Sequence, residues 1–419
     1  MSAQKIMQRI EALAKISETP ENLTRTLGTP AMRRANELVA KWMREAGMKM
    51  RVDAIGNLIG RYDGEKSNAK ILLLGSHLDT VRDAGKFDGP LGVILAIACV
   101  EHLHQKKIRL PFAIEVVGFA DEEGARFQTA YLGSKVLAGC FDEEDLRQKD
   151  ADGISMAEAI KNFGGNPAKI KSAKLNSKNL LGYVEAHIEQ GPVLENKNLP
   201  LGIVTAIAGQ TRAKIIFKGR AGHAGTTPMY LREDALCASA EFILASENLA
   251  RRTNGLVATI GEISAKPGAS NVISGEVHLS LDLRHAKDSI RKSALRKLRQ
   301  IAFEIAARRK MKVDFEIVHE AAAVSCSKTF SKLLGKSILR RQKKLIQLPS
   351  GAGHDAAMMA KICPAVMLFI RCKNGISHHP DESVKIADAK IALDVLGDFL
   401  KSLAEKYRQG AGRSGKFFP

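Results

Sequence analysis

The sequence predicts an α/β protein with a mainly parallel sheet, helices on both faces of that sheet, and an inserted ferredoxin-like α+β domain. Near-continuous apolar runs at 71–75 and 112–120 alternate with a helical pattern at 91–104, which is typical of a parallel sheet covered on both sides. After residue 210 the order becomes strand, helix, strand, strand, helix, strand, as in the split βαβ motif. We therefore expect a discontinuous main domain at 1–210 and 322–419 and an inserted domain at 211–321.

The elements of the main domain follow from local signals. Thr29 and Pro30 fit a helix N-cap followed by proline at the first helical position, so a helix is expected to run to about Gly47. Further strands are expected at 50–54, 58–62, 71–75, 112–120 and, with a weaker pattern, 180–186. After the insertion, a helix at 329–341, a strand at 365–371 and a helix at 388–407 are expected to close the domain.

The inserted domain is expected to contain its own alternation of elements. Strands are predicted at 212–218, 256–263, 276–283 and 312–318, and helices at 232–250 and 287–310. The second helix is strongly basic, yet it keeps a regular row of apolar residues for one face. It is therefore expected to pack on the sheet of this domain.

Composition indicates a globular protein with two or three domains in its 419 residues. Residues 1–17 are predicted to form an amphipathic helix without the apolar core of a signal peptide, and no run reaches the ~20 apolar residues of a membrane span. Six scattered cysteines without a CxxC motif suggest free thiols in a reducing compartment, so a cytoplasmic location and no membrane association are expected. The tail at 409–416 has a disordered composition.

The chain carries a net charge of +19, from 64 basic and 45 acidic residues. One interpretation is nucleic-acid binding and the other is a solvated basic surface. No zinc-finger spacing is present and only 5% of residues are aromatic, so we favour the second and expect no nucleic-acid partner. A positive surface would also attract a small anionic substrate.

Five potential metal ligands each lie just after a predicted strand: His77, Asp88, Glu123, His187 and His378. In α/β sheets, binding sites lie in the crevice beyond the carboxyl ends of strands. Three histidines and two acids can hold two divalent ions with one bridging carboxylate, an arrangement that polarises carbonyl groups and activates water. A single histidine at a strand end is usually a surface residue. The coincidence of five such positions favours a metal site.

Two further acids have separate predicted tasks. Glu122 and Glu123 are adjacent, so their side chains point apart; one can bind metal while the other takes a proton from water. Asp79, two residues after His77, can accept a hydrogen bond from the far ring nitrogen of that histidine. An acid pair such as this is otherwise more often simply solvated.

These residues lie in motifs that resemble the amidase, hydantoinase/carbamoylase family, a group of di-metal hydrolases that includes N-carbamoyl-L-amino acid hydrolases, allantoate amidohydrolases and β-ureidopropionases. The resemblance covers about residues 33–403 and rests on several motifs. They are Gly75-Ser-His-Leu-Asp-Thr80, Phe87-Asp-Gly89, Asp121-Glu-Glu-Gly-Ala-Arg-Phe127, His187-Ile-Glu-Gln190, Gly222-His-Ala-Gly-Thr-Thr-Pro228, Asp282-Leu-Arg284, Ser350-Gly-Ala-Gly-His-Asp355 and Gly375-Ile-Ser-His378.

The resemblance implies a role for each position. His77 and His187 would hold one metal, Glu123 and His378 the other, and Asp88 would bridge them. Glu122 would be the general base, Asp79 the orienting acid, and His223 a catalytic group that polarises the substrate carbonyl. The implied substrate-binding residues are Gln190, His223, Asn271, Arg284, Gly351 and Ala352. The planar fork of Arg284 suits a carboxylate.

The implied activity is a metal-dependent amidohydrolase that cleaves the C–N bond of a ureido acid, either an N-carbamoyl-L-amino acid or allantoate. Attack by a metal-bound hydroxide would release ammonia and carbon dioxide. Two divalent ions per chain are expected, with zinc favoured and manganese, cobalt or nickel as alternatives. In relatives the inserted domain acts as a lid and pairs two subunits, so a homodimer is expected.

Three alternatives stay open at the level of sequence. A dipeptidase or aminoacylase uses a similar site, although such relatives usually carry an acid where this chain has His187. An inactive binding protein is the other rival, disfavoured by the intact set of ligands. His379 follows His378 directly where asparagine is common, so either histidine could be the ligand, and alignment to the motif selects His378.

Overall fold

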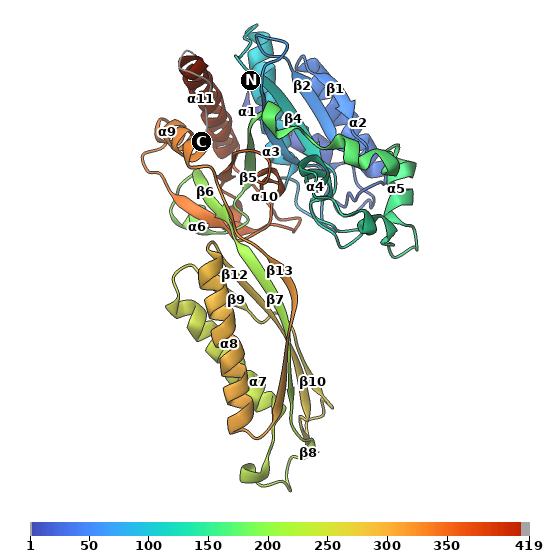
Figure 1. The fold of residues 1–419 in the computed structure, drawn as a ribbon, viewed down its shortest axis with the longest axis vertical. Helices are drawn as coiled ribbons and strands as arrows, with labels where there is room; N and C mark the ends of the chain where they lie inside the picture. Colours follow the sequence, from blue (N-terminus) through green and yellow to red (C-terminus); the bar gives the residue numbers. More distant parts are fainter. Residues whose placement is uncertain (1, 412–419) are drawn as a thin grey trace. The chain divides into compact units, whose positions relative to one another are not determined.

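The computed structural model describes residues 2–411, and the chain divides into two compact units (Figure 1). The first consists of the described parts of Met1–Thr205, Cys326–Leu348 and Gly353–Pro419, and the second of Ala206–Ser325 and Pro349–Ala352. The predicted insertion at 211–321 lies within the second unit. Of the tail predicted to be disordered, residues 409–411 end the last helix, and the remainder lies outside the described residues.

A nine-stranded sheet contains the strands of the first unit. Its strands are β1 (Lys49–Val52), β2 (Leu58–Tyr62), β3 (Ile71–His77), β4 (Ala113–Phe119), β5 (Leu180–Ile188), β6 (Leu201–Ile207), β14 (Val324–Ser325), β15 (Gln347–Ser350) and β16 (Ala365–Ile370). The order is β1-β2-β4-β3-β5-β16-β6-β14, with β15 paired to β6. The four central strands, β4, β3, β5 and β16, are parallel. The mainly parallel sheet is thus confirmed for the centre, while both edges are antiparallel.

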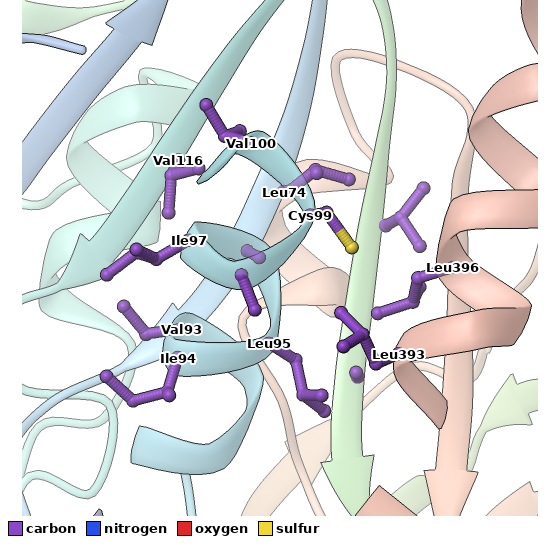
Figure 2. Close-up of a cluster of buried hydrophobic side chains, with 14 of the residues drawn as sticks. Leu74, Val93, Ile94, Leu95, Ile97, Cys99, Val100, Val116, Leu393 and Leu396 are labelled. Atoms are coloured by element: carbon purple, nitrogen blue, oxygen red, sulfur yellow. The ribbon is translucent and has the colours of Figure 1, made fainter. Parts of the chain in front are cut away.

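One face of this sheet carries the main hydrophobic core. Alternate residues of each strand point to the same face, so Leu72 and Leu74 of β3 join Val184 and Ala186 of β5. Five helices cover this face: α1 (Ala3–Ala14), α2 (Pro30–Glu45), α3 (Pro90–Gln105), α9 (Lys328–Leu339) and α11 (Ile386–Ala411). Figure 2 shows the apolar side chains of α3 packed between Leu74 and Val116 of the sheet and Leu393 and Leu396 of α11.

The start of α2 follows the sequence signal. The Oγ1 of Thr29 accepts a hydrogen bond from the backbone N–H of Met32 at 3.2 Å, and Pro30 occupies the first turn. Capping of this kind satisfies one of the free N–H groups at a helix start.

The opposite face of the sheet is polar near its carboxyl edge. It carries Glu185 and His187 of β5 and His77 of β3, because these positions alternate with the core residues. Two short helices, α4 (Leu132–Ala138) and α10 (Ala356–Met359), contact the sheet and each other outside the main core. With α5 (Met156–Phe163), α4 forms a smaller apolar cluster, while α6 (Val193–Asn196) follows β5. Helices therefore lie on both faces, as predicted.

The second unit contains a five-stranded antiparallel sheet and two long helices. Its elements are β7 (Gly209–Lys218), β8 (Gly222–His223), α7 (Ala235–Arg252), β9 (Val257–Thr259), β10 (Ile263–Lys266), β11 (Val272–Ile273), β12 (Glu276–His285), α8 (Asp288–Arg308) and β13 (Lys312–Ala321). The order is β10-β12-β7-β13, with β9 also paired to β12. Helices α7 and α8 contact each other and the same face of this sheet (Figure 1). This connectivity is that of the split βαβ motif.

Two elements differ from the sequence predictions. The single strand expected at 256–263 is wrong: β9 and β10 are separate strands because the chain leaves the sheet at 260–262. Helix α7 begins three residues later than expected, where the side chain of Asp234 accepts from two backbone N–H groups. All six cysteines are free thiols. Among residues 2–411, no helix is long and apolar enough to cross a bilayer.

Candidate metal centre

The predicted ligands lie at the carboxyl ends of the four parallel strands. His77 is the last residue of β3, and His187 is the next-to-last residue of its neighbour β5. Asp88 follows β3 directly before α3, Glu123 follows β4, and His378 follows β16. These four strands are adjacent in the sheet and run in the same direction, so their ends bring together residues that are far apart in sequence.

Asp88 is the centre of this group. Its Oδ1 lies 3.0 Å from Nε2 of His187 and 3.6 Å from Nε2 of His77. Its Oδ2 lies 3.2 Å from Nε2 of His378, which in turn is 3.4 Å from Oε1 of Glu123. Two ligand triads therefore share Asp88: one with His77 and His187, the other with Glu123 and His378.

The hydrogen bonds of the two buried histidines suit metal binding. Nδ1 of His77 lies 3.1 Å from the carbonyl oxygen of Asp79, and Nδ1 of His187 lies 2.9 Å from that of Ile188. In the neutral rings Nδ1–H donates to these carbonyls, which leaves the Nε2 lone pairs directed at Asp88. Oδ1 of Asp88 is buried and accepts no hydrogen bond. Two nitrogen lone pairs that converge on a buried carboxylate oxygen fit a divalent cation.

The electrostatics of the centre favour positive charge. Burial lowers the pKa of His77, but the carboxylates of Asp79 and Asp88 more than offset it and raise that pKa well above its usual value. The hydrogen bond to Asp88 raises the pKa of His378 to about 9. Burial raises the pKa of Glu123 to about 7. The clustered carboxylates therefore stabilise positive charge at this position, whether it is carried by a protonated histidine or by a bound cation.

Glu122 forms a third group of possible ligands with one member of each triad. A carboxylate oxygen of Glu122 lies within 4.8 Å of ligand atoms of His77, from one triad, and of Glu123, from the other. Its side chain is buried, and burial raises the pKa of its carboxyl well above the usual value, although the charge of His77 opposes this. A carboxylate with a raised pKa beside two potential metals is placed to exchange protons with a reacting group.

Asp79 lies near His77, as expected from the sequence, but its hydrogen bonds go to other residues. Its carboxylate lies 3.5 Å from Nδ1 of His77, farther than its own carbonyl oxygen. The two carboxylate oxygens instead accept hydrogen bonds from the backbone N–H groups of Glu122 at 3.0 Å and Glu123 at 3.1 Å. Asp79 thus ties the loop after β4 to the loop after β3, a contact that local sequence does not reveal.

The structure separates the two adjacent histidines. Nε2 of His378 points to Asp88 and Glu123, whereas the side chain of His379 is 60% exposed and its Nδ1 lies 3.6 Å from Asp381. His378 also has a positive φ of 57°. Of the two, only His378 lies with the other candidate ligands.

Gln190 also contacts Asp88. Its Nε2 donates to Oδ2 of Asp88 at 2.8 Å, and its Oε1 is buried without a hydrogen-bond partner. The residue has a positive φ of 56°, which is unusual for a side chain of this size. The orphan oxygen of Gln190 can accept a hydrogen bond from an N–H group of a bound molecule.

The other predicted substrate-binding residues lie in the second unit. His223 and Asn271 are brought close together, since His223 pairs with Val272 and the carbonyl of Asn271 accepts from the N–H of Ala224. Arg284 binds Asp282 through Nε and Nη2, at 2.7 and 2.9 Å, and donates from Nη1 to the carbonyl of Gly351 at 2.6 Å. The N–H of Ala352, next to Gly351, donates to the Oγ of Ser350.

Several residues near the centre were not singled out as site residues from the sequence. Glu185 accepts from the Oγ of Ser76 and from the N–H of Ala356, and it forms a possible ligand group with His187 and His354. Glu382 accepts from the backbone N–H groups of Phe87 and Asp88. Glu185 could have been found by its place two residues before His187 on the same strand face. Glu382, in the segment His378-His-Pro-Asp-Glu382, lies in no strand pattern that would have placed it near the candidate ligands.

Comparisons with known proteins identify the family. The model of peptidase family M20/M25/M40 matches residues 73–402. An N-carbamoyl-L-amino acid amidohydrolase of Geobacillus stearothermophilus is 40% identical over 97% of this chain and 99% of its own length. Allantoate deiminase 1 of Glycine max is 39% identical over 94% of this chain and 88% of its own. The crystal structure of an amidase of the hydantoinase/carbamoylase family from Burkholderia multivorans superposes with a TM-score of 0.91 at 30% identity, covering 96% and 98% of the two chains.

The chain therefore belongs to peptidase family M20/M25/M40. Within it, the predicted resemblance to the hydantoinase/carbamoylase amidases is confirmed. The chain is an enzyme of the hydrolase class that acts on C–N bonds other than peptide bonds.

Proposed function

We propose that this protein is a di-metal amidohydrolase that cleaves a C–N bond of a ureido acid and releases ammonia and carbon dioxide. The observation that carries the proposal is the placement of Glu122 within 4.8 Å of ligand atoms from both triads that share Asp88. A buried carboxylate in this place could take a proton from a water molecule activated by bound metal. The names of the relatives support the ureido substrate.

Each side chain of the centre has a proposed task. His77 and His187 would hold one divalent ion, Glu123 and His378 would hold the other, and Asp88 would be shared by both groups of ligands. When bound, the two ions polarise the substrate carbonyl and lower the pKa of water. Glu122 accepts a proton from the attacking water and passes it to the leaving nitrogen. Zinc is the favoured metal, because nitrogen and carboxylate ligands suit it, with manganese, cobalt and nickel as alternatives.

Polar groups of each unit are proposed to recognise the substrate. Arg284 presents a planar guanidinium held at Nε and Nη2 by Asp282, which suits it to recognise the carboxylate of a ureido acid. His223 and Asn271 are proposed to bind the carbonyl and amide groups of the substrate. The backbone groups of Gly351 and Ala352 are proposed to contribute to substrate binding. Gln190, with its buried orphan oxygen, is proposed to accept from a ureido N–H.

Overall sequence identity does not distinguish N-carbamoyl-L-amino acids from allantoate as the substrate. The carbamoyl amino acid hydrolase and the allantoate deiminase match this chain at 40% and 39% identity. Both substrates combine a ureido group with a carboxylate, so the same Arg284 and Gln190 would serve either. The proposal therefore names ureido acids as the substrate class.

The sharpest test of the mechanism is Glu122→Gln. The amide keeps the size of the side chain but is not a base, so kcat is expected to fall about 10²- to 10⁴-fold. Metal content should stay near two ions per chain, because Glu122 is not a proposed ligand. A folded Glu122→Gln protein with undiminished turnover would contradict the assigned role.

The substrate class is tested with the wild-type protein. Ammonia release is measured with allantoate, N-carbamoyl-β-alanine and several N-carbamoyl-L-amino acids, and hydrolysis of a dipeptide and an N-acetyl amino acid is measured alongside. Turnover of a ureido acid supports the proposal. Turnover confined to the dipeptide or the N-acetyl compound would instead support the peptidase or aminoacylase alternative, and no turnover of any member would favour an inactive binding protein.

We further propose that the second unit acts as a lid and pairs two copies of the chain in the cytoplasm. In support, it exposes three consecutive apolar side chains: Met229 is 75% exposed, Tyr230 84% and Leu231 50%. Apolar surface of this kind is often covered by a partner. Light scattering, which gives the mass of the particle in solution, distinguishes a dimer from a monomer.

A further inference from the structure

Glu382 is a buried acid that contacts the metal centre without being one of its ligands. Its Oε1 accepts hydrogen bonds from the backbone N–H groups of Phe87 at 2.6 Å and Asp88 at 3.0 Å. The residue is 2% exposed. Two N–H groups on one carboxylate oxygen fix the backbone from which the shared ligand Asp88 projects.

The other oxygen of Glu382 reaches the loop of a second ligand. Oε2 lies 3.2 Å from the Oγ of Ser377, the residue before His378. The same Oγ donates to Oδ2 of Asp88 at 2.6 Å. The backbone N–H of Glu382 also donates to the carbonyl of His379 at 3.0 Å. Glu382 therefore joins the loop after β3, with Asp88, to the loop after β16, with His378.

His378 needs such support because of its backbone. Its φ of 57° lies in the left-handed region, which costs energy for a residue with a side chain. Unusual backbone conformations persist when surrounding contacts hold them. The contacts of Glu382 with Ser377 and His379 lie on both sides of this residue.

Gly85 keeps space for the Glu382 side chain. A Cβ atom at Gly85 would lie 2.3 Å from Cδ of Glu382 and 2.4 Å from its Cβ. The φ of Gly85 is not positive, so its backbone accepts other residues. The absence of a side chain at this position is explained by the close approach of Glu382.

We propose that Glu382 is a positioning residue that holds Asp88 and His378 at the spacing required for two divalent ions. Groups that orient metal ligands typically affect metal affinity about 10- to 100-fold. The role rests on the proposed metal centre, but it concerns binding of the ions and does not depend on the identity of the substrate.

The experiment measures binding of Zn²⁺ and of Mn²⁺ to chelator-treated protein by calorimetry, with metal content checked by mass spectrometry. Glu382→Ala is expected to weaken binding by about 10- to 100-fold, because both loops lose their link. Glu382→Gln is expected to restore most of the affinity, since its amide oxygen can accept from both N–H groups and its NH₂ can donate to Ser377. Circular dichroism and thermal unfolding check that each variant is folded.

Two further variants complete the design. Asp381→Ala is the matched control: this neighbour is 77% exposed and its carboxylate pairs with the exposed His379, so affinity should stay at the wild-type value. Gly85→Ala removes no functional group but forces Glu382 to move, so it should weaken binding in the same direction as Glu382→Ala.

The outcomes distinguish failure of the proposed metal centre from failure of the positioning role of Glu382. If the wild type does not bind two ions, the proposal of a two-metal centre is wrong. If it binds two ions and folded Glu382→Ala binds them equally tightly, the positioning role is overturned. Equal weakening by Asp381→Ala, or failure of Glu382→Gln to restore binding, also overturns it. Should Glu382→Ala not fold, unchanged affinity in Gly85→Ala overturns the positioning role in its place.

Discussion

Replacing Glu123 by glutamine should stabilise the metal-free protein, and only at neutral to alkaline pH. Burial and the charges of Asp88 and Asp79 raise the pKa of Glu123 from 4.5 to about 7, although His77 and His378 oppose the shift. This difference corresponds to about 3 kcal/mol of unfavourable free energy for the ionised carboxylate in the folded chain. Its side chain is only 10% exposed, so solvent screens little of this cost.

The sign of the pH dependence follows from proton binding. Between pH 4.5 and about 7, the folded chain keeps the proton on Glu123 while the unfolded chain has lost it. Stability therefore falls as pH rises through this window. From about pH 5 to about pH 8, this single group should remove roughly 2–3 kcal/mol, a cost that glutamine does not incur.

The assay is thermal unfolding of chelator-treated wild type and Glu123→Gln at about pH 5 and about pH 8. At the higher pH the variant should melt roughly 3–5 °C above the wild type, and at the lower pH the gap should nearly close. Glu37→Gln, at an exposed position of α2, is the control and should show no pH-dependent gap. Adding Zn²⁺ should raise the melting temperature of the wild type more than that of Glu123→Gln. A gap that does not change with pH would refute the reasoning.

Two further predictions concern residues whose roles the structure distinguishes. His378→Ala should lower bound metal from two ions to about one per chain by mass spectrometry, whereas His379→Ala should retain both, because only His378 faces Asp88. Asp282→Asn should raise KM about 10-fold with a smaller change in kcat, since Asp282 holds the guanidinium of Arg284 by two charge-assisted hydrogen bonds. Loss of kcat at unchanged KM would contradict that role.

Much of the fold could be predicted because its signals are local. Thr29 and Pro30 mark the start of α2, and the apolar run at 71–75 marks the core of β3. The candidate ligands could be predicted for a related reason. Each follows a strand, and parallel strands have a common carboxyl edge, so residues at their ends must lie near one another. The pairing of strands at the antiparallel edges had no comparable signal.

The details of the centre depend on contacts between distant parts of the chain. Glu382 accepts a hydrogen bond from Phe87, 295 positions earlier, and no pattern in either segment predicts this bond. The carboxylate of Asp79 reaches the N–H groups of Glu122 and Glu123 for the same reason. The break between β9 and β10 was also missed, because residues 256–260 are mostly apolar up to the point where the chain leaves the sheet.

The sequence by itself determined the class of the protein: a parallel sheet whose strand ends carry histidines and acids in the motifs of the hydantoinase/carbamoylase amidases. These properties depend on residue type and on spacing along the chain. Only the tertiary structure decided which of His378 and His379 faces the other candidate ligands, that Asp88 belongs to two triads, and that Glu382 joins their loops. Those features depend on the direction of side chains across neighbouring loops, which packing of the whole sheet sets.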